Sequence, residues 1–243
     1  MKRLLLVLAF VPVVALASEA GEALDPAPID ARDLVSLQSG ARTFVNYCVN
    51  CHGAQYMRYN RLEDLGLTEA QIRDNLMLAS DKVGDTMKVA LSTEQGKAWF
   101  GVPPPDLSLV GRSRGADWLY TYLRSFYRDE KSATGWNNAV FPNVAMPHVL
   151  WSLQGVRALE TTEAEGEGEH GGGAVQHWTQ LSPGTMSTVD YDRTVRDLVN
   201  YLVYMGEPAA QSREAIGIVV LFVLGVLFVL AYAMKAEFWK DVR

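Results

Sequence analysis

Apolar residues recur at helical spacing in four stretches of the chain. Residues 34–47 carry them at intervals near three and four, which predicts an amphipathic helix in spite of Gly40. A second strongly amphipathic helix is predicted at 189–205, and weaker helical patterns cover 69–78 and 117–127. The sequence contains no internal repeat. The pattern therefore predicts a mostly α-helical protein.

The chain begins with a short apolar segment. Residues 1–17 carry Lys2 and Arg3 directly after Met1 and end in Ala15-Leu16-Ala17. A positive start, a short apolar run and a small-x-small triplet are typical of a secretory signal peptide. We therefore expect cleavage after Ala17 and export of the residues that follow, with an uncleaved amino-terminal anchor as the alternative.

A longer apolar segment occupies residues 215–234, where no charged residue occurs in 20 positions. At about 1.5 Å per residue, a helix of this length spans the roughly 30 Å hydrocarbon core of a bilayer. Basic residues follow at 235–243, as on the cytoplasmic side of a membrane. The predicted organisation is a periplasmic domain at 18–214, one carboxy-terminal transmembrane helix in the cell membrane, and a cytoplasmic tail.

Composition and charge narrow the classes of function. The chain has 243 residues, of which 49% are hydrophobic, and a net charge of −6. This hydrophobic content is typical of a folded protein, and the acidic balance argues against a nucleic-acid-binding face. Residues 160–173 hold five Glu and five Gly and predict an exposed flexible loop. The loop is interpreted either as a solvated spacer or as an acidic surface for a basic partner.

The two cysteines of the sequence, Cys48 and Cys51, are followed directly by His52. This C-x-x-C-H spacing is the attachment signature of c-type haem, in which two thiols bond one porphyrin and the histidine binds the iron. A zinc site would need ligands from a second cysteine pair, and a thioredoxin-like dithiol would follow a strand rather than a helix. The motif predicts one covalently bound haem c per chain. The alternative is a local disulfide in a protein without haem.

A haem iron that carries electrons needs a sixth ligand besides His52. Met146 lies in the irregular segment 143–147, where neighbouring prolines restrict the backbone and a thioether can point inward. We predict Met146 as this ligand, with Met186 and a histidine such as His148 as alternatives. A methionine and histidine pair raises the reduction potential, which suits a late electron carrier. The other candidates are Met57, Met77, Met87, Met205, His170 and His177.

Several further segments form a set of motifs with the haem signature. They are Ser39-Gly40-Ala41, Pro104-Pro105-Asp106-Leu107-Ser108, Arg112-Ser113-Arg114, Ala145-Met146-Pro147 and Gly184-Thr185-Met186-Ser187. Together they resemble the cytochrome c1 family, the haem subunits of the cytochrome bc1 complex, across most of the chain. The resemblance implies a mostly α cytochrome c fold with long loop insertions and one carboxy-terminal transmembrane helix.

The resemblance also implies roles for particular residues. Arg114 corresponds to an arginine that pairs with a haem propionate, and Pro105 is expected to pack against the ring. Met146 corresponds to the axial methionine of the family. The haem is expected between the helices at 34–47 and 189–205 and the loops that carry Pro105 and Met146.

The function that the resemblance implies is one-electron transfer. The haem is expected to accept one electron from the Rieske iron–sulfur protein and to pass it to a cytochrome c, beside cytochrome b in the membrane. The resemblance implies that the chain by itself is an electron carrier, and that it belongs to an enzyme as a subunit of quinol–cytochrome c reductase. The alternative is another membrane-anchored c-type cytochrome, such as an oxidase or nitric-oxide reductase subunit.

Overall fold

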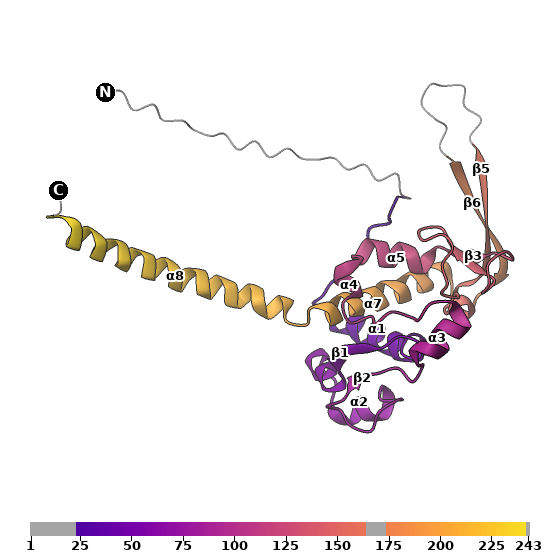
Figure 1. Cartoon of the computed structure of the whole chain (residues 1–243), viewed down its shortest axis with the longest axis horizontal. Coiled ribbons are helices and arrows are strands. Elements are labelled where there is room, and N and C mark those ends of the chain that lie inside the picture. Colours follow the sequence, from indigo (N-terminus) through magenta and orange to yellow (C-terminus); the bar gives the residue numbers. More distant parts are fainter. Residues whose placement is uncertain (1–22, 164–173, 242–243) are drawn as a thin grey trace.

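Two helices pack together at the centre of the structure, and a long third helix projects away from them (Figure 1). The computed structural model describes residues 23–163 and 174–241. Helix α1 (Leu34–Tyr47) has the predicted bounds, and α7 (Thr188–Gly206) exceeds the prediction by one residue at each end. Helix α8 (Ala210–Trp239) is the one that projects. The prediction of a mostly α-helical cytochrome c fold is confirmed.

The contact between α1 and α7 depends on a residue without a side chain. Gly40 lies so close to α7 that a Cβ atom added to it would be 2.0 Å from the carbonyl oxygen of Asp197. Nearby, the rings of Phe44 and Tyr201 are 5.6 Å apart, and both are fully buried. The Ser36 hydroxyl donates to the Asp197 carboxylate over 2.8 Å. Close backbone approach, ring packing and a buried hydrogen bond therefore hold the two helices together.

Local capping explains where the shorter helices begin. The side chains of Thr68 and Gln71 each accept from the other residue's N–H, and this capping box starts α2 (Glu69–Asn75). Helix α3 (Thr93–Phe100) begins with a box of the same kind. Helix α2 ends before the predicted residue 78, because the N–H of the buried Met77 bonds a carbonyl five residues back. The remaining helical segments are η1 (Tyr59–Leu65), α4 (Val110–Ser113), α5 (Ala116–Arg124) and α6 (Trp151–Gln154).

Antiparallel strand pairs accompany the helices. They are β1 (Ala54–Arg58) with β2 (Thr86–Met87), β3 (Phe126–Arg128) with β4 (Trp136–Asn138), and β5 (Gly155–Glu163) with β6 (Ala174–Pro183). The helix predicted at 117–127 was too long, since α5 stops at Arg124 and the residues after it pair with β4. The predicted loop at 160–173 began too early, since residues 160–163 pair with β6 in a long hairpin.

The signal peptide predicted at 1–17 lies wholly outside the described residues. Of the acidic loop predicted at 160–173, residues 164–173 lie outside them as well. The lead-in segment before α1 is described from residue 23 and runs past α5, where the N–H of Ala27 donates to the Asp117 carboxylate over 2.8 Å. This contact attaches an irregular segment to the helical domain.

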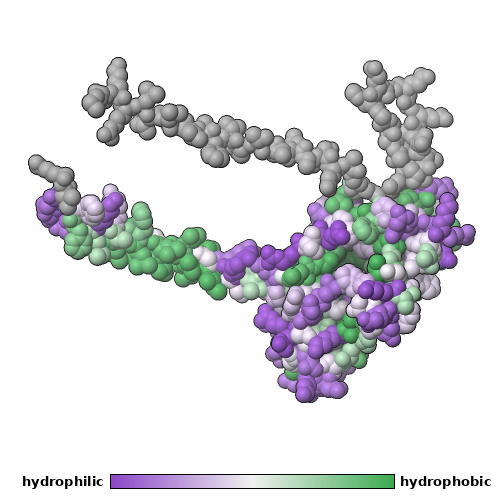
Figure 2. Space-filling view, in the orientation of Figure 1, coloured by the Kyte–Doolittle hydropathy of each residue, from purple (hydrophilic) through white to green (hydrophobic). Residues whose placement is uncertain are grey.

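Helix α8 has the length and apolarity of a membrane span. Its segment Ser212–Trp239 has 28 residues, and the most apolar part has a mean hydropathy of 2.9 and no buried residue. Figure 2 shows a hydrophobic surface along the middle of the helix with hydrophilic ends. Among the helices that the structure describes, α8 alone meets these criteria. The helix contains the predicted span at 215–234 and fits a single-pass membrane anchor.

A carboxylate joins the anchor to the domain. Glu207 lies between α7 and α8, and its side chain is 28% exposed. It pairs with Arg112 of α4 at 3.3 Å and with Arg213 in the first turns of α8. The start of the anchor is therefore tied to α4 as well as to α7.

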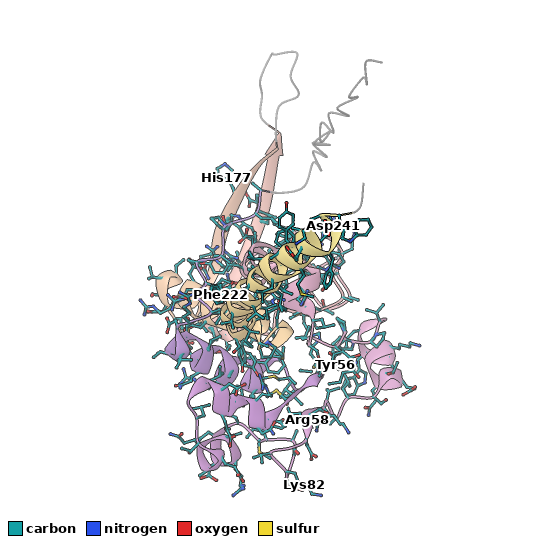
Figure 3. The ribbon with its side chains drawn as sticks, turned by 90° about the vertical axis from the view of Figure 1, so that its left-hand side faces the viewer. Tyr56, Arg58, Lys82, His177, Phe222 and Asp241 are labelled. Carbon is teal, nitrogen blue, oxygen red and sulfur yellow. The ribbon has the colours of Figure 1, made fainter. Side chains whose placement is uncertain are left out.

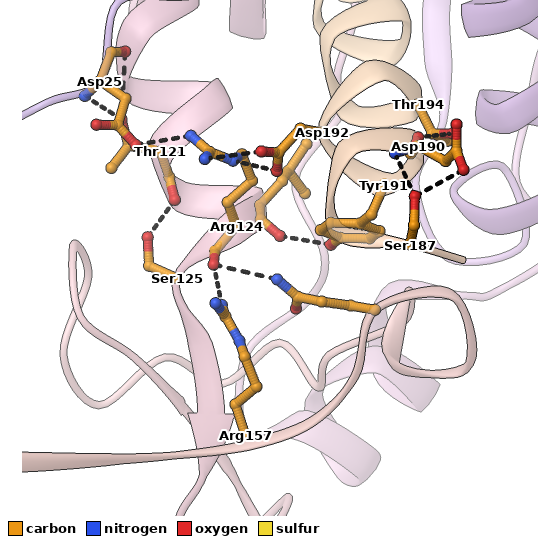
Figure 4. Close-up of polar contacts among 12 residues, drawn as sticks. Asp25, Thr121, Arg124, Ser125, Arg157, Ser187, Asp190, Tyr191, Asp192 and Thr194 are labelled. Atoms are coloured by element: carbon orange, nitrogen blue, oxygen red, sulfur yellow. Dashed lines mark hydrogen bonds and ion pairs between the residues drawn. The ribbon is translucent and has the colours of Figure 1, made fainter. Parts of the chain in front are cut away.

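A polar network joins the lead-in segment, α5 and α7 (Figure 4). The Arg124 guanidinium donates to Asp192 of α7 over 2.7 Å and to Asp25 of the lead-in over 2.6 Å. The Arg124 carbonyl oxygen accepts from the guanidinium of Arg157 at the base of the hairpin. The hydroxyl of the buried Tyr191 donates to another carbonyl of α5 over 2.8 Å. Arg124 thus links the lead-in segment, α5, α7 and the base of the hairpin, which are distant in the sequence.

Replacement of Arg124 by methionine is expected to lower the free energy of unfolding by about 2 kcal/mol, because two carboxylates lose charged hydrogen bonds. Arg73→Met is the matched control, since its ion pair with Glu69 is exposed and is worth less than about 1 kcal/mol. Thermal unfolding of the two detergent-purified variants measures both losses. Equal losses would contradict the structural role of Arg124.

Candidate functional site

A cavity of about 490 Å³ lies between α1, α5, α7 and the loops near residues 102–107 and 141–149. Its size is in the range of about 300–1,000 Å³ that is usual for cofactor pockets. Most of its lining is apolar, and two thiols, one imidazole, one thioether and one guanidinium are also part of the wall. The apolar lining includes Phe100, Val102, Pro103, Leu119, Leu123, Val144, Leu198 and Leu202.

The residues of the C-x-x-C-H motif lie together on the wall of this cavity. Cys48 caps the end of α1, and its carbonyl accepts from the N–H groups of Cys51 and His52 over 3.1 and 2.9 Å. This turn brings both sulfur atoms and the imidazole to the same space. Both thiols are free, so the alternative of a local disulfide is not what the structure shows. Burial, with a smaller contribution from Cys51, raises the pKa of the Cys48 thiol to about 12.

A backbone carbonyl orients the imidazole of His52. Nδ1 lies 2.7 Å from the carbonyl oxygen of Pro105, and because a carbonyl can only accept, Nδ1 carries the proton. Nε2 is then left with the lone pair that a metal ion needs. Burial lowers the pKa of His52 and outweighs the bond to Pro105 and the charge of Asp106, so the neutral ring is favoured. From the sequence, Pro105 is predicted to pack against the haem ring, and nothing in the sequence indicates the contact of its carbonyl with His52.

The segment around Pro105 is itself held next to the haem motif. The Asp106 carboxylate accepts from the N–H groups of Gln55 and Ser108 over 2.8 and 2.9 Å. The N–H of Leu107 donates to the carbonyl of Gly53 over 2.8 Å. These bonds join the proline-rich segment to the residues directly after His52, so the imidazole and its acceptor keep their relative position.

Met146 reaches the cavity from a loop whose backbone is held by asparagines. Asn143 adopts a left-handed conformation with φ of 61°, which asparagine tolerates better than most residues, and its N–H donates to the Asn137 side chain over 2.8 Å. The Met146 side chain lines the cavity and packs against the core. Its sulfur accepts a hydrogen bond from the Tyr122 hydroxyl at 3.4 Å.

The other predicted axial candidates lie elsewhere. Met186 is 36% exposed and lines a separate polar cavity of about 350 Å³ beside Arg124. His148 is buried, stacks on Phe126 at 4.9 Å and bonds Gln154 over 2.7 Å, and burial lowers its pKa to about 4. His177 lies on the hairpin (Figure 3), and His170 is outside the described residues. Met57, Met77, Met87 and Met205 are buried but do not line the cavity of about 490 Å³.

Arg114 lies at the edge of the cavity with its charge available. Its guanidinium carbon is 4.8 Å from the centre of the Trp118 ring and 5.7 Å from that of Phe141. Within the described residues no carboxylate pairs with it. Two aromatic rings therefore hold a planar cation at the cavity mouth, where an anionic group of a ligand can pair with it.

Two residues that support the cavity were not assigned to the site from the sequence. Tyr122 lies within the helix predicted at 117–127, but nothing in that pattern indicates the contact of its hydroxyl with Met146. Asn138 is fully buried, and its amide donates to the Tyr122 carbonyl over 2.7 Å while its oxygen accepts from the N–H groups of Val140 and Phe141. No local sequence signal indicates the bonds of Tyr122 with Met146 and Asn138, because they join residues that are 24 and 16 positions apart.

Comparison with known proteins agrees with this arrangement. The model of the Cytochrome C1 family matches residues 26–167 and 173–242. The chain belongs to the cytochrome c1 family. It is 48% identical over 247 aligned positions to the Cytochrome c1 of Allochromatium vinosum, and the match covers 100% of both chains.

Two further relatives show the range of similarity. The chain is 49% identical over 242 positions to the Ammonia monooxygenase gamma subunit of Nitrosomonas europaea, which covers 100% of this chain and 98% of that protein. It is 22% identical over 243 positions to the mitochondrial Cytochrome c1 heme protein of Saccharomyces cerevisiae, with 89% and 70% covered. The similarity therefore extends over nearly the whole chain in each case.

Membership of the cytochrome c1 family defines the cofactor and the kind of assembly. The family carries covalently bound haem c, and this chain is a haem c electron-transfer subunit of a bc1 oxidoreductase complex. This favours the cytochrome c1 interpretation over an oxidase or nitric-oxide reductase subunit. The residues fit the cofactor, because one apolar cavity is lined by two thiols, an imidazole with a free Nε2 and a thioether.

Proposed function

We propose that Cys48 and Cys51 form the thioether bonds to one haem c, and that His52 and Met146 are its axial ligands. The observation that carries this proposal is the lining of the cavity. Among the methionines and histidines that the structure describes, only these two line it, and both cysteines line it as well. When bound, haem c supplies a site that takes up and releases one electron.

The protein residues orient the ligands and exclude water. The Pro105 carbonyl holds the His52 ring through Nδ1, so that Nε2 would be available to bind the haem iron. The thioether of Met146 favours a high reduction potential, and the apolar walls of the cavity disfavour the additional positive charge of the oxidised centre. Arg114 and Pro105 both line the cavity. Arg114 would pair with a haem propionate, and Pro105 would pack against the haem.

The proposed orientation places the haem domain in the periplasm and the carboxy terminus in the cytoplasm. A cleaved signal peptide at 1–17 would export the domain at 18–214, and the anchor at 215–234 would leave the tail 235–243 inside. The basic residues after the apolar part of α8 support this direction. In this position the domain would lie beside cytochrome b and the Rieske protein, from which it takes electrons for a cytochrome c.

Single-turnover absorbance of the purified complex tests the proposed transfer. Quinol is expected to reduce the haem of this chain only when the Rieske protein is present, because the proposed electron path to the haem passes through that protein. Oxidised cytochrome c added afterwards is expected to reoxidise it. Reduction by quinol at an unchanged rate in a complex depleted of the Rieske protein would contradict the proposed order.

The name of the Nitrosomonas relative suggests a second candidate, which is assembly with monooxygenase subunits. Purification of the anchored chain in mild detergent separates the two candidates. Cytochrome b and the Rieske protein are expected to co-purify. Monooxygenase subunits in their place would favour the second candidate.

A further inference from the structure

The strongest unassigned contact in the haem cavity joins a phenol to the proposed axial ligand. The hydroxyl of Tyr122 donates to the sulfur of Met146 over 3.4 Å. Both residues line the cavity, and Tyr122 is buried with 9% of its surface exposed. Within the described residues, no other hydrogen bond reaches this sulfur. Among the described residues, the hydrogen-bond donor to this thioether is therefore on α5.

The surrounding residues hold the phenol in place. The ring of Tyr122 stacks on Trp118 at 4.7 Å with an angle of 11°, and it meets the edge of Phe126 at 5.1 Å. The carbonyl of Tyr122 accepts from the buried amide of Asn138 over 2.7 Å. With both the ring and the backbone fixed, the hydroxyl occupies one position relative to the cavity.

Met146, in contrast, has a side chain that needs a positioning contact. Methionine has three rotatable bonds and a polarizable sulfur, so packing alone specifies its conformation weakly. A thioether sulfur has two lone pairs. One can bind a metal while the other accepts a hydrogen bond, so the contact with Tyr122 is compatible with ligation.

We propose that the Tyr122 hydroxyl positions the sulfur of Met146 and raises the reduction potential of the haem. This inference rests on the proposed role of Met146 as an axial ligand. A hydrogen bond from the hydroxyl withdraws electron density from the sulfur. The sulfur would then donate less electron density to the iron, which destabilises the ferric state relative to the ferrous state and raises the reduction potential. Hydrogen bonds to a ligand atom are one of the means by which a protein sets a haem potential. Tyr122 is a positioning and tuning residue that does not bind the metal itself.

Tyr122→Phe in the full-length protein tests the inference, because it keeps the ring and removes the hydroxyl. Redox titration of the haem absorbance is expected to show a lower potential. At a fixed ambient potential, the ferrous-to-ferric ratio is expected to fall about threefold, or ~28 mV at 59 mV per tenfold for one electron. The sulfur-to-iron charge-transfer band of the oxidised protein is expected to persist at a shifted energy.

Tyr120→Phe is the matched control. Tyr120 is buried on the same helix with 7% exposed, but its ring faces the guanidinium of Arg124 at 4.4 Å and it does not line the cavity. This variant is expected to leave both the potential and the band unchanged. An unchanged potential in Tyr122→Phe, or a change shared with Tyr120→Phe, would overturn the inference. Absence of the band from the wild-type protein would instead overturn the assignment of Met146 as the ligand.

Discussion

The double variant Cys48→Ala/Cys51→Ala is expected to carry no covalent haem and to accumulate poorly. Without its cofactor, the domain would keep a largely apolar cavity of about 490 Å³. At about 24 cal/mol per Å³, an unfilled space of this size costs at most ~12 kcal/mol, which is comparable to the total stability of about 5–15 kcal/mol of a typical domain. The cofactor is therefore expected to be part of the folded core. Haem staining after denaturing electrophoresis, with an immunoblot for total protein, measures both effects.

Met146→Leu is the matched control for the cysteine variant. It removes the proposed sixth ligand and conserves most of the side-chain volume, so haem staining is expected to remain. The charge-transfer band is expected to disappear and the potential to fall, because the sulfur no longer contributes to the coordination. Stained haem in the double cysteine variant would show that the attachment site lies elsewhere.

Gly40→Ala is expected to lower the free energy of unfolding by about 3 kcal/mol. In an isolated helix the change would be favourable by about 1 kcal/mol, because glycine is a poor helix former. Here the new Cβ would lie 2.0 Å from the Asp197 carbonyl oxygen and 2.7 Å from the Cβ of Tyr201. Neither atom can rotate away, so α1 and α7 must separate. Overpacking usually costs about 1–3 kcal/mol and occasionally more. For a 2.0 Å contact with helix backbone we expect a cost of about 4 kcal/mol, which the better helix propensity of alanine reduces to about 3 kcal/mol.

Separation of α1 and α7 is also expected to disturb the proposed haem site. Cys48 caps the end of α1, and α7 contributes Leu198 and Leu202 to the cavity. Thermal melting followed by haem absorbance measures the effect, with a decrease of roughly 6–12 °C expected for a domain of this size. Gly84→Ala is the control, since a Cβ there meets nothing within 4 Å. A higher melting temperature for Gly40→Ala would contradict the packing argument.

Features that are encoded by residues close together along the chain could be predicted from the sequence. The periodicity at 34–47 predicted the bounds of α1, since an amphipathic helix repeats within a few residues. The C-x-x-C-H motif indicated the cofactor because its chemistry is contained in five consecutive positions. The apolar composition of 215–234 indicated the anchor, which needs no partner within the chain.

The sequence left the sixth ligand open, and the fold narrowed the choice. Met146, Met186 and His148 could all be weighed from the sequence alone. In the structure, Met146 lines the cavity of about 490 Å³ with the two cysteines and His52, Met186 lines a second cavity, and His148 lies in an aromatic cluster. The predicted helix at 117–127 was too long for a related reason. Helical periodicity continues past Arg124, but the backbone after it pairs with β4 instead.

The sequence by itself determined the class of cofactor, the main helices and the membrane segment, because each is encoded over a short stretch or by composition. The tertiary structure decided how these parts make a site. The carbonyl of Pro105 meets His52 across 53 positions, and Tyr122 meets Met146 across 24. Glycine is required at position 40 because α7 crosses α1 there and leaves no space for a Cβ atom. Such contacts depend on which distant residues come together, and local patterns do not contain that information.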